Sequence, residues 1–218
     1  MTGLTLDRPW LRLTLGAPHE VLSWAVNRPG FVVADEILWR EVRNRDLPRD
    51  LDVTDWFSDE LRRHNALNTV AFLTSRDVRR YVERRAEVEG ITARAVATVG
   101  LSNAERVGQR MDYSTRNWGT INIAVQVSAG LTQTALIEAM SIATEARTAA
   151  VMEAGFTLPS GVATGTGTDC IAVAAPAGAL AYAGLHTALG EAIGRAVYTA
   201  TLAGAQAWIT ERQEAHHA

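Results

Sequence analysis

The chain has 218 residues, a formal net charge of −3 and 47% hydrophobic residues, values ordinary for a globular protein of one domain or two small ones. All 21 basic residues are arginine, which excludes a Schiff-base lysine and the lysine of a Walker-type phosphate loop. The near-neutral charge predicts that neither nucleic acid nor an anionic membrane is a partner.

Cys170 is the only cysteine in the sequence, so no disulfide within the chain and no cysteine-based zinc site is expected. Residues 1–13 contain no apolar run of the signal-peptide type. The least charged stretch, 170–190, is mostly alanine and too weakly apolar for a membrane span. We therefore expect a cytoplasmic protein with no membrane-spanning segment.

Apolar periodicity and turn residues divide the chain into strands and helices. In chain order, we expect a strand at 9–15, one or two strands within 30–42, a loop over 43–56, a strand at 68–74, a helix at 75–90, strands at 92–100 and 118–130, a helix at 131–155, a strand at 170–175 and an Ala/Gly-rich helix, continuous or interrupted, over 182–213.

The strand at 118–130 and the helix at 131–155 have the clearest patterns. In the strand, isoleucines and valines occupy one face, and Asn122 and Gln126 lie on the other. The helix has a threonine available as a cap at its start, and Gly155 and Pro159 stand at its end. The helix at 75–90 is expected because a serine precedes it and Gly90 follows it.

Strands outnumber helices and do not alternate with them regularly. This order predicts an α+β fold in a single domain, with a largely antiparallel sheet and helices packed on it. A layered, doubly wound α/β fold is the alternative. The Ala- and Gly-rich helix faces would suit a homo-oligomer and an ordinary core equally well.

The stretch SGVATGTGTDCIAVAAP, residues 160–176, is the most unusual in the chain. A phosphate loop would need a lysine and a following helix, whereas here Gly165 and Gly167 precede Asp169 and a strand-like run. An aspartate at this position would repel a phosphate. The stretch is either a glycine bend required by close packing or a hydroxyl-rich part of a binding site.

Several other polar residues are candidates for chemistry. His186 is the only histidine between the N-terminal third and the final His-His pair, and Glu145 lies off the apolar face of its helix. Ser102 and Asn103 follow one predicted strand, and a second group, Thr120 and Asn122, stands at the start of another. The sequence contains no H-x-x-x-H or H-E-x-x-H motif and no G-x-S-x-G elbow, so we expect neither a zinc site of that type nor an α/β-hydrolase serine.

Taken in order, the segments VGLSNA, GTINI, ATEAR, ATGTGTDCIAVA and YAGLHTALG resemble the adenosylcobinamide amidohydrolase family. The resemblance is strongest over residues 95–200. In that family a lysine often stands where this chain has Arg147.

The resemblance implies hydrolysis of the amide that joins aminopropanol to a propionate of the corrin ring, which gives adenosylcobyric acid. Activity on complete corrinoids with a non-preferred lower base is also implied. The cobalt corrinoid would be the substrate, and no further cofactor or metal is expected. Hydroxyls, amides and glycine backbone would bind the amide-fringed ring; the residues expected to do so are Ser102, Asn103, Thr120, Asn122, Thr164, Gly165, Thr166, Gly167 and Thr168.

Our mechanistic hypothesis is direct attack by water. Asp169 or Glu145 would be the base, and His186 the acid or orienting partner. Backbone N–H groups of 165–167, or Asn122, would hold the oxyanion.

Two other possibilities stay open. Thr166 or Thr168 could be a covalent nucleophile, as in a threonine amidase or acyltransferase. Alternatively, the chain could bind corrinoids without catalysis, with His186 as an axial cobalt ligand.

Overall fold

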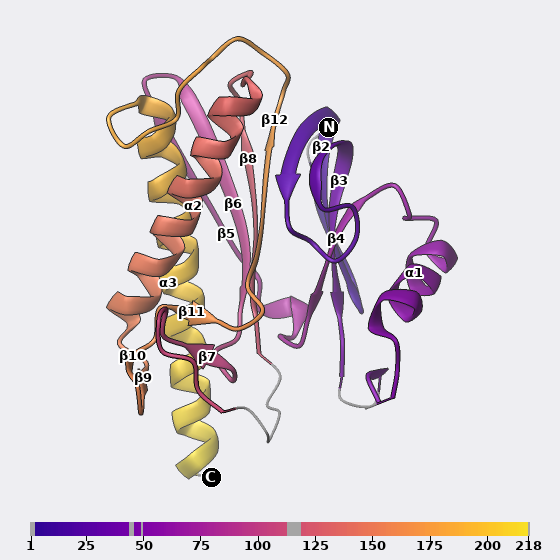
Figure 1. Ribbon diagram of the computed structural model, residues 1–218, viewed down its shortest axis with the longest axis vertical. Helices are drawn as coiled ribbons and strands as arrows, with labels where there is room; N and C mark the ends of the chain where they lie inside the picture. The colour runs from indigo at the N-terminus through magenta and orange to yellow at the C-terminus, as the bar shows by residue number, and fades with distance from the viewer. Residues whose placement is uncertain (1–2, 44–45, 49, 113–118, 218) are drawn as a thin grey trace.

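The computed structural model describes residues 3–43, 46–48, 50–112 and 119–217, and within these residues eight strands form one curved sheet (Figure 1). Its order is β4-β3-β2-β12-β8-β6-β5, with β1 added to β2. The strands of this sheet are β1 (Gly3–Asp7), β2 (Trp10–Ser23), β3 (Gly30–Glu41), β4 (Val70–Thr74), β5 (Val82–Val88), β6 (Ile91–Val99), β8 (Ile121–Val127) and β12 (Cys170–Ala175).

Most neighbouring strands are antiparallel, while β3 with β4 and β8 with β12 run parallel. Three α-helices accompany the sheet: α1 (Val53–Arg63), α2 (Gln133–Ala154) and α3 (Ala188–His217). Short strand pairs complete the described part: β7 (Ala104–Glu105) with β11 (Gly165–Thr166), and β9 (Thr157–Leu158) with β10 (Gly161–Val162). This arrangement confirms the predicted α+β class with a largely antiparallel sheet.

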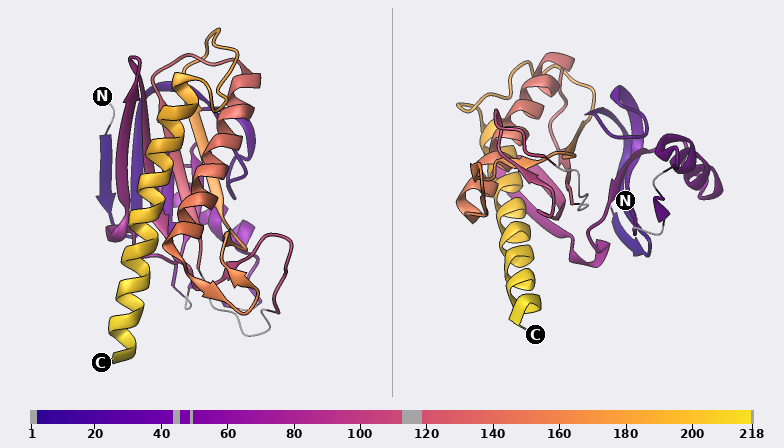
Figure 2. Two further views of the ribbon diagram at one scale, coloured as in Figure 1. Left: turned by 90° about the vertical axis from the view of Figure 1, so that its left-hand side faces the viewer. Right: turned by 60° about the horizontal axis from the view of Figure 1, so that its bottom comes forward.

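The sheet buries apolar side chains on both faces. Helices α2 and α3 lie side by side across β5, β6, β8 and β12, over a core of alanine, valine, isoleucine and leucine (Figure 2). On the opposite face, the half formed by β2, β3 and β4 curves toward β12, β8 and β6, so that their side chains form a second, inner core. Helix α1 covers the outer side of that half through Phe57 and Leu61.

Strand β8 contributes side chains to both cores. Its isoleucines and valines pack under the helices, as the alternation predicts, while Asn122 and Ala124 point to the inner side. Asn122 is only 1% exposed, so the polar face of this strand is buried and not solvated. Trp118, which the prediction placed in this strand, lies outside the described residues.

Helix α2 begins and ends where the sequence predicts. The Thr132 hydroxyl accepts a hydrogen bond from the N–H of Ala135, and Gly155 closes the helix in the left-handed conformation at φ 73°. Helix α3 begins at Ala188, later than the predicted residue 182. Thr187 caps the helix at this point, because its hydroxyl accepts a hydrogen bond from the N–H of Gly190 at 2.9 Å.

The predicted helix at 75–90 is wrong. A single 3₁₀ turn, η2 (Val78–Arg80), leads into β5, which pairs with β6 through a tight turn at Glu89 and Gly90, both at positive φ. Val82, Ala86 and Val88 recur with a period of two and face the core under α3. Gly90 is therefore a hairpin residue and not a helix cap.

The predicted loop at 43–56 is wrong for its last residues, because α1 already begins at Val53. The Asp52 carboxylate caps this helix by accepting from the N–H groups of Thr54 and Asp55, at 2.9 and 3.1 Å. Residues 44–45 and 49 of this range lie outside the described part.

No helix in the described ranges has the length and apolar character needed to cross a membrane.

Candidate active site at the amino edge of two parallel strands

Polar side chains gather at the edge of the sheet where β8 and β12 begin. The two strands run parallel, with Cys170 opposite Asn122, so the segments that precede them meet at one edge. Strand β6 ends at the same edge, because Val99 pairs with Ile121. The segments around 102–105, 119–122 and 164–169 are therefore brought together.

Asp169 is the centre of the turn between β11 and β12. Its carboxylate accepts hydrogen bonds from the N–H groups of Thr166 (3.0 Å) and Ile121 (3.2 Å), from the Thr166 hydroxyl and from the Arg147 guanidinium. Burial raises the pKa of Asp169, against the opposing effects of the Arg147 charge and the hydrogen bonds from Thr166 and Ile121. The acceptor positions of this carboxylate are occupied, so it holds the turn and Arg147 in place.

Gly165 permits this arrangement. A Cβ at this position would collide with the Arg147 guanidinium and with Oδ2 of Asp169. A glycine is therefore needed here for the approach of an ion pair to the backbone, and not for a positive φ.

A second network fixes the segments on either side of the turn. The Thr168 hydroxyl donates to the carbonyl of Gly119 (2.9 Å) and accepts from Nδ2 of Asn103 (3.2 Å). The Thr120 hydroxyl donates to the carbonyl of Thr168 at 2.8 Å. Ser102 contributes through its backbone, which lies directly against Gly119.

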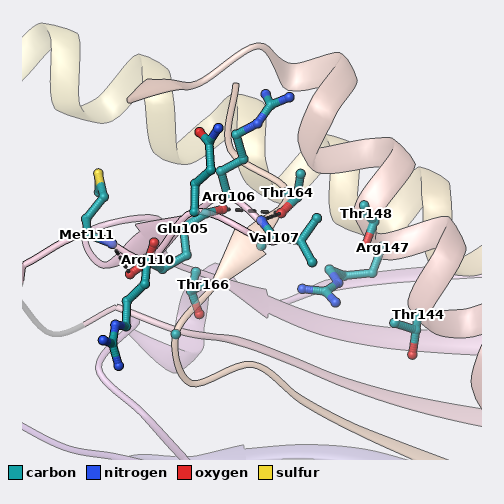
Figure 3. Close-up of a pocket in the computed structure, with 14 residues that line it drawn as sticks. Glu105, Arg106, Val107, Arg110, Met111, Thr144, Arg147, Thr148, Thr164 and Thr166 are labelled. Carbon is teal, nitrogen blue, oxygen red and sulfur yellow. Dashed lines mark hydrogen bonds between the residues drawn. The ribbon is translucent and has the colours of Figure 1, made fainter. Parts of the chain in front are cut away.

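A cavity of about 890 Å³ opens beside this turn, between it and α2. Its volume is in the upper part of the range for small-molecule sites. The Arg147 side chain extends from α2 toward the wall that carries Glu105 and Thr166 (Figure 3). The lining residues are Glu105, Arg106, Val107, Gly108, Gln109, Arg110, Met111, Thr144, Arg147, Thr148, Thr164, Gly165, Thr166 and Gly167.

Some of the buried polar atoms that have no hydrogen-bond partner among the described residues belong to this site. They include Oε2 of Glu105, Nε of Arg147 and Oδ1 of Asn103. The other carboxylate oxygen of Glu105 accepts only a long hydrogen bond of 3.4 Å from the N–H of Met111. Two of these atoms belong to residues that line the cavity, Glu105 and Arg147, so a side-chain shift toward the cavity would bring an unsatisfied acceptor and an unsatisfied donor to a ligand.

The structure separates two of the predicted catalytic residues from Asp169. Glu145 is exposed on α2, accepts a hydrogen bond from the Ser141 hydroxyl at 3.1 Å and does not line the cavity. His186 is exposed in the segment after β12. The six residues of β12 separate that segment from Asp169 by roughly 20 Å, at about 3.3 Å per residue.

Three of the donors expected to hold the oxyanion are engaged elsewhere. The N–H of Thr166 donates to Asp169, and the N–H of Gly167 donates to the carbonyl of Asn103 at 3.2 Å. Nδ2 of Asn122 donates to the carbonyl of Leu73 at 2.7 Å. Asn122 therefore connects the two halves of the sheet.

Sequence reasoning did not select Glu105 or Arg147 as candidates, although both line the cavity. Glu105 directly follows the VGLSNA segment, so a charged residue after a polar strand end was an available signal. Arg147 lies within the ATEAR segment, but only the fold shows that it reaches the turn.

Within the described ranges, no three His, Cys, Asp or Glu side chains come close enough together to bind a metal ion.

Comparisons with known proteins place this geometry in context. A family model described as CbiZ, adenosylcobinamide amidohydrolase, matches residues 3–213, which confirms the resemblance seen in the motifs. No curated protein matches the chain. Among solved structures, the PH0078 protein from Pyrococcus horikoshii OT3 is similar with a TM-score of 0.44 and 10% identity, over 89% of this chain and 76% of that one.

Proposed function

This chain belongs to the adenosylcobinamide amidohydrolase family and is an amide hydrolase, and we propose that it cleaves the amide between aminopropanol and the corrin propionate. The products would be adenosylcobyric acid and aminopropanol. The observation that carries the site is the pair of unpaired buried atoms, Oε2 of Glu105 and Nε of Arg147, in two residues that line the large cavity. With family membership established, the non-catalytic corrinoid-binding alternative is set aside.

Water is the proposed nucleophile, and Glu105 is the proposed base. Glu105 takes a proton from water as the water oxygen bonds to the amide carbon. The carboxylate of Asp169 is less suited to this role, because its acceptor positions are filled by Thr166, Ile121 and Arg147. Asp169 instead positions Arg147 and the turn.

Arg147 is the proposed donor to the oxyanion. The Nε–H group is buried and unpaired, while the other end of the guanidinium is held by Asp169. A preorganised charged donor of this kind stabilises the negative charge that develops on the carbonyl oxygen. Protonated Glu105 then donates its proton to the amide nitrogen as the C–N bond breaks, so that the amine leaves neutral.

The test is to incubate the protein with adenosylcobinamide and to follow the corrinoid by liquid chromatography and mass spectrometry. We expect adenosylcobyric acid with the wild-type protein. Glu105→Gln should lower kcat at least about a hundredfold, the scale of a lost general base. Glu145→Gln, an exposed carboxylate outside the cavity, tests the alternative base and should retain wild-type turnover.

Two outcomes would contradict the proposal. If wild-type protein forms no acid, the substrate is wrong. If Glu105→Gln is folded and fully active, the base is another group.

A covalent route through Thr166 is the second candidate, because its hydroxyl already donates to the Asp169 carboxylate. A hydroxyl beside a carboxylate is the arrangement of a nucleophile and its base. Trapping of an acyl-enzyme on Thr166 by mass spectrometry would establish this route, and full activity of Thr166→Val would exclude it.

We also propose that complete corrinoids are substrates, since the scissile amide is shared and exposed residues Val107–Arg110 leave the cavity open to solvent. No metal is required in this proposal, because Arg147 supplies the positive charge. Turnover should persist in EDTA. We place the reaction in the cytoplasm, where reducing conditions suit a chain with one free cysteine.

A further inference from the structure

A smaller cavity lies on the other side of the turn between β11 and β12, residues 167–169, which is the proposed catalytic turn. Its volume is about 290 Å³, and it opens at the end of the inner core between the two halves of the sheet. Gly167 lines both cavities, so the two cavities adjoin at this turn. The residues around the smaller cavity are Trp24, Val26, Phe72, Leu73, Asn122, Gly167, Thr168, Asp169 and Cys170.

Trp24 gives this cavity an aromatic wall. The side chain is exposed, with a relative exposure of 46%, although tryptophan is usually well buried. Its Nε1–H donates to the carbonyl of Asp169 at 2.6 Å, so the edge of the indole is fixed while its surface stays accessible. Val26, 47% exposed, and the buried ring of Phe72 extend the apolar lining.

We propose that the smaller cavity is a subsite for the adenosyl group of the substrate, with Trp24 contacting the adenine ring. This inference rests on the proposed function. The cavity is too small for a corrin macrocycle but is suitable for a purine-sized group, and aromatic side chains bind bases by stacking. The adenine is the flat aromatic part of this substrate.

The chemistry of the substrate requires two separate sites. The adenosyl group is bonded to cobalt and projects from a face of the corrin ring, whereas the scissile amide is on a side chain at the ring periphery. The two cavities likewise lie on opposite sides of the turn. Glu105 and Arg147 line the cavity assigned to the amide, and Trp24 lines the cavity assigned to the adenosyl group.

The experiment compares two substrates with the same scissile amide, adenosylcobinamide and methylcobinamide. Steady-state kcat/KM is measured for wild-type protein and for Trp24→Ala, Trp24→Phe and Tyr182→Ala. We expect Trp24→Ala to lower kcat/KM about tenfold for adenosylcobinamide, the effect of one lost stacking contact, and to leave methylcobinamide unchanged. Trp24→Phe keeps an aromatic ring without the indole N–H and should retain most of the preference.

Tyr182→Ala is the matched control, since Tyr182 is an exposed aromatic residue in the segment after the carboxyl end of β12. This substitution should leave kcat/KM unchanged for both substrates. Equal losses on both substrates for Trp24→Ala would overturn the proposal, because Trp24 would then serve only to shape the turn through its bond to Asp169. Equal kcat/KM of the two substrates with wild-type protein would overturn it as well.

Equilibrium dialysis separates this inference from the proposed reaction. If neither compound is hydrolysed, the proposed function fails, and binding of the same two corrinoids still tests the subsite. Tighter binding of adenosylcobinamide than of methylcobinamide, lost in Trp24→Ala, would support the adenosyl subsite. Equal affinity of wild-type protein for the two corrinoids would refute the subsite.

Discussion

Arg147 and Asp169 form the ion pair on which the site depends, and their side chains are only 13% and 7% exposed. Removing one member of a buried pair leaves the other charge uncompensated. We predict that Arg147→Lys, which keeps the positive charge, retains activity within about tenfold of wild type, whereas Arg147→Gln loses at least about a hundredfold in kcat.

The measurement for this pair is turnover of adenosylcobinamide, with circular dichroism as a control for folding. Equal activity of folded Arg147→Lys and Arg147→Gln would show that the charge at this position has no part in the reaction.

Cys170 gives a second prediction at the residue scale. Burial raises the pKa of its thiol to about 12, so the reactive thiolate is scarce near neutral pH. We predict that native protein at pH 8 reacts with a chromogenic disulfide reagent far more slowly than urea-unfolded protein does. With one cysteine in the chain, labelling in both states reports on this residue alone, and equal rates would contradict its burial.

The candidate site could be predicted only in part. The hydroxyls and glycines of 164–168 were recognisable because their composition is unusual, and the strand ends at 102 and 120 because polar residues interrupt apolar runs. Glu105, Arg147 and Trp24 were not, since only the fold brings each of them to the proposed site. The separation of His186 from Asp169 was predictable, since the strand expected at 170–175 lies between them, but the sequence reasoning did not draw this consequence.

At the scale of elements, the segment from β11 to β12 should tolerate a methyl group at Gly167 but not at Gly165. Gly165→Ala places a methyl group against Arg147 and Asp169, whereas a Cβ on Gly167 would have ordinary contacts at 3.9 and 4.0 Å with Asn103 and Glu105. We predict that Gly165→Ala lowers the urea midpoint of unfolding by the equivalent of about 1–3 kcal/mol, while Gly167→Ala changes it little. Equal midpoints for the two variants would mean that the ion pair moves aside without cost.

Strand β5 shows where element prediction failed. Residues 82–88 contain four charged residues, as the exposed face of a helix would, so the period of two in Val82, Ala86 and Val88 was overlooked. Pairing with β6 and packing under α3 decide the conformation. Helix α2, by contrast, was predictable, because its Thr132 cap and its Gly155 end are signals carried by the segment itself.

At the scale of the whole molecule, Glu41 connects three segments of the N-terminal half. It is 2% exposed and accepts hydrogen bonds from Arg8, from Arg43 and from the N–H of Val78. Burial by itself would raise the pKa of Glu41, but the bonds from Arg8 and Val78 and the charge of Arg43 outweigh it and hold the pKa below its ordinary value. The folded state therefore favours the ionised form.

A lowered pKa in the folded state contributes stability that is present above the unfolded pKa and is lost as the pH falls through the folded pKa. We predict that Glu41→Gln lowers the free energy of unfolding at pH 7 by about 1–3 kcal/mol, and that its difference from wild type shrinks in acid. Urea titrations at pH 7 and in the acid range measure both effects. Glu87→Gln, at an exposed carboxylate on β5, is the control, and a difference that stays constant with pH would contradict the linkage.

Strand β12 lies between β2 and β8 in the sheet, although it follows both in the chain. The Ser23 hydroxyl donates to the carbonyl of Ile171 at 2.9 Å across 148 residues of sequence. During synthesis at roughly 5–20 residues per second, β2 thus waits about 7 to 30 s for its neighbour. Contacts between segments so far apart in the sequence form slowly, so β12, the last strand of the sheet to be made, completes the inner core in a late step, and α3 then covers the outer core. Until then the apolar inner face of β2, β3 and β4 is uncovered, so that chaperones can bind it and the chain can aggregate through it.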